Sequence, residues 1–222
     1  VANVTHEIRT PLTAIIGYLE TIKSGRVKNT EDISKFVSIM LNQAERLNRL
    51  VEDLMTISKI ELGEMSFQYE DINFQEVIVG VIPLLEKKAQ EKKIKIINSI
   101  TQKMTAIRGD KDRLMQIFVN ILDNAVKFTQ NNGTVTIKAS ETKDTVIIDI
   151  TDTGTGIPKE EIQRLGERFY RADKTRSRDL GGTGLGLSIV KHLMVAHGGR
   201  MEIESELGRG TKISLIFPLP NC

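Results

Sequence analysis

Two glycine-rich segments in the C-terminal half of the chain have the composition of loops that hold phosphate groups. Residues 152–158 read DTGTGIP, and residues 181–187 read GGTGLGL. Glycine lacks a Cβ atom, so a ligand can approach the backbone of such segments closely. The second segment leads into a stretch of helical periodicity, and the N-terminus of a helix offers unpaired N–H groups to a phosphate. Ordinary turns also use glycine, so these segments alone leave both interpretations open.

Two widespread nucleotide-binding motifs are absent from the sequence. It contains no G-x-x-x-x-G-K-S/T segment, which excludes a P-loop. After Gly182 and Gly184, Leu187 occupies the position where a dinucleotide-binding fingerprint has its third glycine. If the glycine-rich segments bind a nucleotide, they do so in another class of fold.

A predicted helix at residues 116–128 adds polar side chains with a fixed spacing. Asn120, Asn124 and Lys127 fall on one stripe of this helix. Amide oxygens can ligate Mg²⁺ directly or through water, and a lysine can meet phosphate oxygens. A solvated helix face is the alternative, but it does not explain two asparagines, which are poor helix formers. The opposite face is apolar, with Ile117, Ile121, Leu122, Ala125 and Phe128.

Five segments, taken in order, resemble the motifs of sensor histidine kinases of two-component systems. Residues 6–13, HEIRTPLT, are similar to the H box of the HisKA-type dimerisation and phosphotransfer domain. Residues 120–127 resemble the N box, 152–156 the G1 box, 168–171 the F box and 182–186 the G2 box. The motifs keep the family's order and spacing, and together they span nearly the whole chain.

Two positions depart from the family's pattern. Gly166 stands where many relatives have a first F-box phenylalanine, and Thr153 replaces the commoner asparagine of the G1 box. Both positions are expected to affect packing more than chemistry. The glycine leaves the packing of the nearby loop open.

The resemblance implies catalytic roles for three residues of the H box. His6 is the expected phospho-acceptor, because a neutral imidazole nitrogen is a nucleophile near pH 7. Glu7 is the expected general base that accepts the second imidazole proton. Thr10 is expected to position water for the dephosphorylation of a partner, although it is equally compatible with an ordinary polar helix residue.

The resemblance also implies an ATP site with Mg²⁺. Asp152 matches the residue that accepts a hydrogen bond from the adenine amino group. Asn124 and Asn120 match the metal ligands, directly or through the metal's water shell, and Lys127 and Arg171 match phosphate contacts. The remaining expected ATP-binding residues are Gly154, Gly156, Gly182, Gly184 and Gly186.

The same resemblance implies two domains and a fold of class α plus α/β. Residues 1–63 are expected to form a helical hairpin that dimerises into a four-helix bundle. Residues 64–222 are expected to form an α/β sandwich of the Bergerat, or GHKL, type that binds ATP. Residues 165–182 have no strong periodicity, and a loop of that length is usually functional. We interpret it as the ATP lid.

The N-terminal part has the periodicity of two helices. Residues 1–25 carry apolar side chains every three or four positions, with Pro11 expected to loosen the helix because it lacks an N–H donor. A turn at 24–29 precedes a second helix, whose apolar residues alternate spacings of four and three. This seam comprises Ile33, Val37, Met40, Ala44, Leu47, Val51 and Leu54. The apolar face is wider than one partner helix covers, so we expect a homodimer. Packing of the hairpin on the rest of the same chain is the alternative.

Beyond Gly63 the pattern changes to that of an α/β domain. Strands are expected at 67–72, 94–100, 134–137, 146–150, 200–206 and 211–217, and helices at 74–92, 110–128 and 184–197. Helices on one face of a mixed sheet would give the α/β sandwich that the motifs imply.

Composition agrees with a globular protein and limits the partners. The chain has 222 residues, 40% hydrophobic and 27% charged, and its net charge of +2 gives no support for nucleic-acid binding. The single cysteine, Cys222, cannot form an internal disulfide, which favours a reducing compartment. No apolar run approaches the roughly 20 residues that span a bilayer. We expect a cytoplasmic fragment without membrane contact of its own. Because it begins only five residues before His6, we expect it to be a fragment excised from a longer parent. A membrane-bound sensor is the expected parent.

The leading functional prediction is an ATP-dependent protein-histidine kinase. It would autophosphorylate His6 and pass the phosphate to an aspartate in the receiver domain of a response regulator, with a phosphatase activity toward that regulator left open. One alternative is a GHKL-type ATPase that hydrolyses ATP as a clamp or chaperone, but such a protein needs no phospho-acceptor histidine. The other is a catalytically inactive dimeric scaffold, in which degraded N and G boxes are expected.

Overall fold

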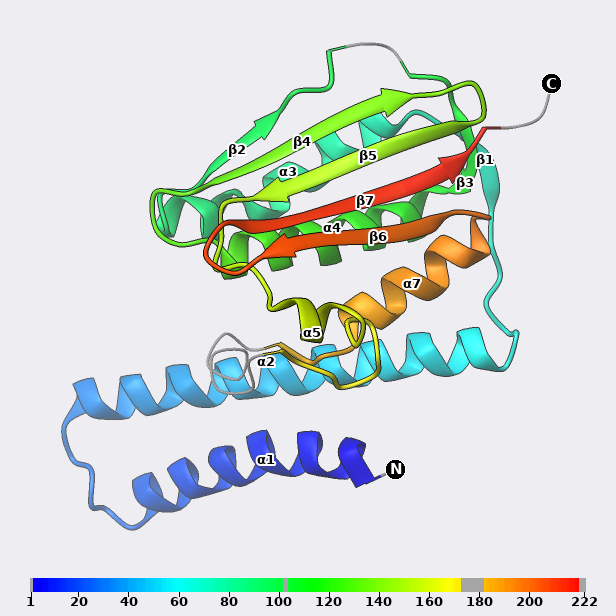
Figure 1. The fold of residues 1–222 in the computed structure, drawn as a ribbon. Helices are drawn as coiled ribbons and strands as arrows, with labels where there is room; N and C mark the ends of the chain where they lie inside the picture. Colours follow the sequence, from blue (N-terminus) through cyan, green and yellow to red (C-terminus); the bar gives the residue numbers. More distant parts are fainter. Residues whose placement is uncertain (1, 102–103, 173–181, 220–222) are drawn as a thin grey trace.

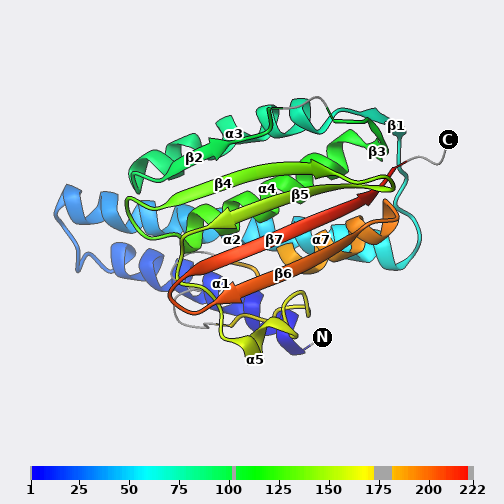
Figure 2. The ribbon, with the colours of Figure 1, turned by 45° about the horizontal axis from the view of Figure 1, so that its top comes forward.

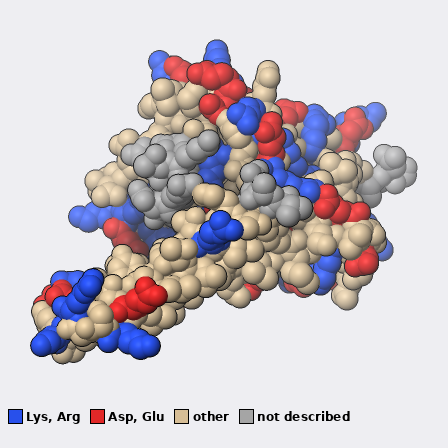
Figure 3. Space-filling model, turned by 90° about the horizontal axis from the view of Figure 1, so that it is seen from below, with Lys and Arg blue, Asp and Glu red and all other residues tan. Residues whose placement is uncertain are grey.

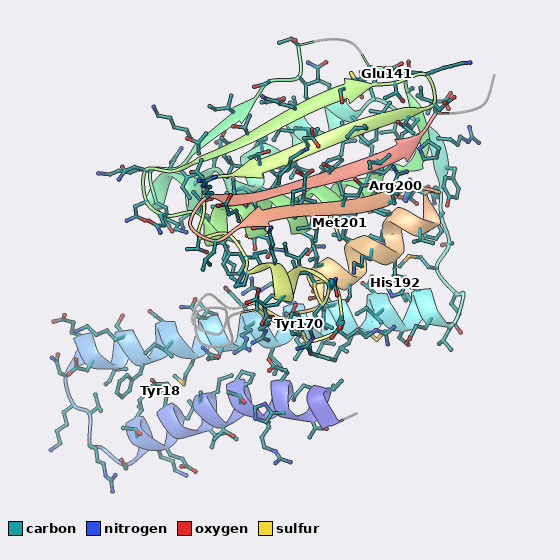
Figure 4. The ribbon with its side chains drawn as sticks, in the orientation of Figure 1. Tyr18, Glu141, Tyr170, His192, Arg200 and Met201 are labelled. Carbon is teal, nitrogen blue, oxygen red and sulfur yellow. The ribbon has the colours of Figure 1, made fainter. Side chains whose placement is uncertain are left out.

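The computed structural model describes residues 2–101, 104–172 and 182–219, and it begins with a helical hairpin (Figure 1). Helix α1 (Ala2–Lys23) continues as one helix through Pro11, and α2 (Thr30–Glu61) returns alongside it. The Asn29 side chain caps α2 by accepting a hydrogen bond from the backbone N–H of Glu31 at 3.1 Å. Tyr18 and Phe36 pack between the two helices with their ring centroids 4.9 Å apart (Figure 4).

A five-stranded mixed sheet forms the second part of the molecule. Its strand order is β2 (Lys95–Asn98), β4 (Thr134–Glu141), β5 (Thr145–Asp152), β7 (Gly210–Pro218) and β6 (Arg200–Glu206). The β2–β4 pair is parallel and the other three pairs are antiparallel, so the predicted mixed sheet is confirmed. Along β5, Val146, Ile148 and Ile150 are buried, and this alternation directs Asp152 to the same inner face.

Three helices cover one face of this sheet (Figures 1 and 2). They are α3 (Phe74–Glu91), α4 (Lys111–Phe128) and α7 (Gly186–Ala196). Their apolar stripes and the inner face of the sheet form one core, in which Phe74 contacts both Phe118 and Phe217. The α/β sandwich is therefore present as the sequence predicts.

Several elements differ from the sequence-based expectation. No element was predicted at residues 107–109, and Asp110 was assigned to the following helix, but the chain forms β3 (Ile107–Asp110) here. This strand pairs with β1 (Tyr69–Ile72) in a separate two-stranded antiparallel sheet. A short helix, α5 (Lys159–Ile162), lies in a segment without helical periodicity. Both are stabilised by neighbours distant in sequence, which a local pattern does not reveal. Of the expected lid at 165–182, residues 173–181 lie outside the described part of the chain.

The sheet domain rests on the hairpin through α2. Helix α2 ends at Glu61, and Gly63, with φ +67°, turns the chain toward the sheet domain. Helix α7 contacts α2, while Tyr170 and His192 lie in the junction between them (Figure 4). Within the described residues, no helix is both long and apolar enough to cross a membrane. The hairpin and the sheet domain are thus in direct contact in this arrangement.

Candidate functional site

A cavity of about 680 Å³ opens at the end of the sheet domain that faces the hairpin. Its walls come from the C-terminal half of α4, the end of β5 and the segments 155–157, 165–172 and 182–187. The hairpin closes one side with Arg49, Glu52 and Asp53 of α2. Of the expected ATP-binding residues, the cavity is lined by Asn120, Asn124, Lys127, Asp152, Gly156, Arg171, Gly182, Gly184 and Gly186. Gly154 is not part of the lining.

Asp152 stands at the inner end of the cavity with its carboxylate held in place. It is 8% exposed, and its Oδ1 accepts hydrogen bonds from the backbone N–H groups of Gly154 at 2.8 Å and Thr211 at 3.3 Å. Burial raises the pKa of Asp152, while the two hydrogen bonds act in the opposite direction. A Cβ atom on Gly154 would lie 2.7 Å from both this oxygen and the carbonyl oxygen of Phe128. This glycine therefore shapes the turn that holds Asp152.

Apolar side chains surround the region next to Asp152. Ile150 of β5, Ile157 after β5, Ile203 of β6 and Ile213 of β7 all line the cavity. A flat aromatic base can bury its faces against such aliphatic walls, while a single well-placed polar group fixes its orientation. This end of the cavity is suited to a purine with an exocyclic amino group.

The N-box side chains project from α4 toward the second glycine-rich segment. Asp110 begins this helix by accepting the backbone N–H of Arg113 at 3.0 Å. Asn120 donates its Nδ2 to the carbonyl of Gln116 at 3.0 Å, which leaves its Oδ1 on the side of Gly186. A Cβ atom on Gly186 would lie 2.7 Å from that oxygen, so a larger residue would displace the asparagine. The N-box helix and the second glycine-rich segment therefore pack closely against each other at Asn120 and Gly186.

Lys127 makes the middle of the cavity cationic. Burial lowers the pKa of Lys127 to about 8; nearby Asp123 acts to raise it, and the neighbouring cations Arg171, Arg49 and Lys88 lower it further. A cluster of cations at the edge of a desolvated cavity attracts an anion, which would relieve this repulsion. The electrostatics match a polyphosphate.

Lys92 fixes the end of α4 that carries Lys127. Its Nζ donates to the carbonyl oxygens of Val126 at 2.9 Å, Lys127 at 2.8 Å and Thr129 at 2.6 Å. These carbonyls lie at the C-terminal end of the helix, where the backbone lacks helical partners and the dipole favours a cation. Sequence reasoning missed this lysine because nothing near it in the chain signals the contact.

Arg171 connects the cavity with the hairpin. Its side chain is 7% exposed, and its Nη2 lies 2.6 Å from Glu7 Oε2 on α1. Its Nε is buried and has no hydrogen-bond partner in the described structure. A buried, unsatisfied guanidinium N–H at the cavity wall is a ready donor for a phosphate oxygen.

The three expected H-box residues have different environments in the structure. Glu7 does not line the cavity, but its carboxylate accepts hydrogen bonds from Arg171, which does, at 2.6 Å and from Arg46 of α2 at 3.0 Å. His6 is exposed on α1 and does not line the cavity. Thr10 is exposed as well, and its hydroxyl donates to the carbonyl of His6 at 3.1 Å. His6 therefore lies on the hairpin and outside the cavity lining.

Two further contacts across this junction had no signal in the sequence. The Thr183 hydroxyl donates to Asp53 Oδ2 at 2.7 Å, and Arg168 forms an ion pair with Glu61 at 2.5 Å. Burial raises the pKa of Asp53, and the bond from Thr183 partly offsets this shift. An acidic residue on an amphipathic helix usually indicates a solvated face, so only the docked sheet domain reveals these partners.

The chemistry of the site fits ATP with Mg²⁺. Within the described residues, no cluster of three or more His, Cys, Asp or Glu side chains could hold a metal ion by itself. A hard cation at this site would rely on the amide oxygens of Asn120 and Asn124 together with phosphate oxygens, as Mg²⁺ commonly does. The unsatisfied Arg171 and the half-buried Lys127 supply the matching positive charge.

Comparisons with known proteins give one family for both parts. Residues 1–63 match the His Kinase A (phospho-acceptor) domain, and residues 109–221 match the family of histidine kinase-, DNA gyrase B- and HSP90-like ATPases. The sensor histidine kinase WalK of Bacillus subtilis is 37% identical over 220 residues, which is 98% of this chain. The chain spans 36% of the length of that relative.

Solved structures agree with the sequence comparisons. Full-length ShkA in complex with AMPPNP is 29% identical, with a TM-score of 0.74 over 100% of this chain and 46% of the other. The histidine kinase ThkA in complex with the response regulator TrrA is 25% identical, with a TM-score of 0.81 over 99% of this chain and 60% of the other. Sequence motifs, cavity and fold converge, and the chain belongs to the histidine kinase family, with a phospho-acceptor domain followed by a histidine kinase-, gyrase B- and HSP90-like ATPase domain.

Proposed function

We propose that this chain is the cytoplasmic catalytic core of a two-component sensor histidine kinase. It phosphorylates His6 with ATP and Mg²⁺ and passes the phosphoryl group to an aspartate of a response regulator. Residues 1–63 act as the phosphotransfer domain and residues 64–222 as the ATP-binding domain. The observation that carries this proposal is the ion pair between Arg171 and Glu7, which joins the cavity to the neighbour of His6.

The residues divide the work between the two domains. Asp152 receives the adenine amino group, Lys127 and Arg171 hold the phosphates, and Asn120 and Asn124 hold Mg²⁺. ATP is the substrate that supplies the phosphoryl group, and Mg²⁺ held by the two asparagines would supply positive charge to its phosphates.

The transfer step itself uses the two neighbouring residues of the H box. A neutral ring nitrogen of His6 forms the bond to phosphorus, while the bond from phosphorus to the bridging oxygen breaks and ADP leaves with the electron pair. Glu7 accepts the proton that the imidazole ring loses. His6 is exposed, so that it can meet the nucleotide and afterwards a second protein.

A homodimer is part of the proposal. Exposed apolar residues follow the outer side of α2 with spacings of four, three, seven and four, and they comprise Val37, Leu41, Ala44, Val51 and Met55. A similar set on α1 comprises Leu12, Ile16 and Leu19. Seen from below, the hairpin is mostly uncharged, and its charged side chains gather at the end with the 24–29 turn (Figure 3). Such a face is suited to pairing with a second hairpin in a four-helix bundle.

A response-regulator receiver domain is the proposed phosphate acceptor. The similar protein ThkA was solved in complex with the response regulator TrrA, and AMPPNP was bound to ShkA. These complexes belong to ShkA and ThkA. Because the structural similarity covers nearly all of this chain, it supports the same class of partner and nucleotide here.

The direct test is incubation with γ-labelled ATP and Mg²⁺. We expect acid-labile, base-stable label on the protein, and we expect His6→Gln to lose it while a fluorescent ATP analogue still binds with unchanged affinity. His192→Gln is the matched control, because this half-buried histidine of α7 lies outside the cavity lining. Label retained by His6→Gln would reject His6 as acceptor. Release of inorganic phosphate without protein label would favour the GHKL-type ATPase.

Asn124→Ala tests the metal assignment separately. A methyl group cannot ligate a hard cation, so we expect the Mg²⁺ dependence of nucleotide binding to be reduced. The measurement is titration with the analogue with and without Mg²⁺. An unchanged Mg²⁺ dependence would show that Asn124 does not contact the metal.

A further inference from the structure

Two arginines from different parts of the molecule meet at one oxygen of Glu7. Arg46 Nη2 on α2 lies 3.0 Å from Glu7 Oε2, and Arg171 Nη2 of the ATP-binding domain lies 2.6 Å from the same oxygen. The side chains are 10%, 7% and 14% exposed for Arg46, Arg171 and Glu7, respectively. A hydrogen bond between ions in such a desolvated place is strong and directional.

Arg46 occupies a position that an apolar residue would be expected to fill. Three residues of α2 are buried, namely Arg46, Leu50 and Ile57, and the arginine is the charged one among them. Burying an ion pair removes both charges from water, and well-packed apolar residues often stabilise a fold as well or better. Stability therefore does not explain this arginine, whereas control over the place of a carboxylate does.

The two arginines differ in what else they serve. Arg171 lines the nucleotide cavity with an unsatisfied Nε, so a bound phosphate competes with Glu7 for its guanidinium. Arg46 is not part of the cavity lining and lies on the same hairpin as Glu7. It can hold the carboxylate whether or not the ATP-binding domain is docked.

We propose that Arg46 is a positioning residue that fixes the Glu7 carboxylate where it accepts the proton of the His6 ring. The proposal rests on the proposed kinase function. Arg46 acts through Glu7 and touches neither the nucleotide nor the reacting nitrogen. By fixing one carboxylate oxygen with a planar guanidinium, it removes the rotamers of Glu7 that would leave this ion pair. Arg171 is the exchangeable second partner, which the ATP-binding domain supplies.

The test is a double-mutant cycle on the rate of phosphohistidine formation. We expect Arg46→Met to lower the rate at saturating ATP about tenfold, with the KM for ATP unchanged, and Arg46→Lys to restore part of the loss. In a Glu7→Gln background, we expect Arg46→Met to change the rate less than about twofold, because residues that act through one another are not additive. Lys35→Met, an exposed change on the same helix, is the control and should leave the rate unchanged.

The outcomes separate this inference from the function on which it rests. Absence of label on the wild-type protein would overturn the kinase function itself. A labelled wild type with equal losses from Arg46→Met in both backgrounds would overturn the inference and show a structural role, as would an increase in the KM for ATP that accounts for the loss. If Arg46→Met does not fold, the same cycle is measured with Arg46→Lys. We then expect a smaller decrease in the rate of phosphohistidine formation, and this decrease should be absent in the Glu7→Gln background.

Discussion

The hairpin and the sheet domain bury their apolar residues to very different extents. In the sheet domain, α4 alone has seven buried residues, among them Ile117, Phe118 and Leu122, each with 0% exposure. In the hairpin, α2 is longer but has three, and large apolar residues such as Leu41 and Met55 are 58% and 56% exposed. The sheet domain completes its hydrophobic core within the chain, whereas the hairpin leaves large apolar side chains exposed.

This difference indicates which region depends on a partner. The sheet domain buries its apolar surface without outside help, so it is expected to fold by itself. Two helices alone cannot bury a wide apolar face from both sides. The sheet domain covers one side of the hairpin, and a second copy of the chain is the proposed cover of the other.

The largest expected effect is removal of a core ring in the sheet domain. Phe118 is fully buried and packs edge to face against Phe74, with their ring centroids 6.0 Å apart. We expect Phe118→Ala to lower the free energy of unfolding of this domain by about 3–5 kcal/mol in urea titrations. Phe36→Ala, the same change in the half-buried hairpin, should leave that transition unchanged. Equal losses from both would contradict the contrast between the regions.

The next effect concerns the exposed seam of the hairpin. Val51 is 46% exposed in the single chain, and in a four-helix bundle it would be buried against the second copy. We expect Val51→Glu to convert the dimer to monomer in sedimentation experiments, because it replaces apolar burial worth about 1.5–3 kcal/mol with a charge. Nucleotide affinity should stay unchanged.

Asn42→Glu is the control for the seam, because it places the same charge on the exposed polar side of the same helix. It should remain dimeric. If Val51→Glu is dimeric as well, this stripe is not the dimer interface.

A smaller effect is expected from the titration of Lys127. Its pKa is lowered to about 8, so it loses its charge, and with it a phosphate partner, as the pH rises through 8. We expect affinity for an ATP analogue to fall about tenfold between pH 7 and 9, a change of about 1.4 kcal/mol. Without nucleotide, the free energy of unfolding should rise with pH above pH 8. The reason is that Lys127 has lost its proton in the folded domain, whereas the unfolded chain still binds it. Lys127→Arg should abolish the pH dependence of binding; a persistent dependence would assign it to another group.

The smallest effect is expected at the exposed ion pair across the junction. Glu61 and Arg168 are 50% and 40% exposed, and surface pairs of this kind contribute little because water and salt screen them. Glu61→Gln should therefore leave the unfolding transition, dimerisation and nucleotide affinity unchanged. A clear loss of autophosphorylation in this variant would show that docking depends on the rim of the junction as well as on its buried contacts.

Periodicity predicted most of the fold because helices and strands were long and strongly patterned. The α4 helix was predicted at 110–128 and begins at Lys111, and the strand expected at 200–206 is β6 with the same bounds. The predicted heptad seam of α2 grouped Leu47 and Leu54 with Val51. In the structure both are partly buried against the core, and Val51 and Met55 are the exposed ones. A heptad repeat shows which residues share an apolar face of a helix, but it does not show which neighbouring element covers each of them.

The candidate site divides in the same way. Residue types and spacing singled out the N-box stripe and the glycine-rich segments, because phosphate and metal binding depends on local backbone geometry, and the family resemblance added Asp152. Of the ATP-binding residues named in this way, all but Gly154 line the cavity. Arg46, Lys92 and Asp53 could not be selected, because a charged side chain on an amphipathic helix usually faces water. Their roles arise from partners that lie 39, 34 to 37 and 130 positions away along the chain.

The sequence by itself determined the long helices and most of the strands, the motif order and the family, because each of these depends on patterns within a few turns or strands. Tertiary structure alone decided that the ATP-binding domain docks on α2, that Glu7 lies between two arginines and that the end of α4 is held by a lysine. The physical reason is that long-range ion pairs and caps depend on which surfaces meet. That outcome is set by the burial of the whole chain and is not recorded in any short segment.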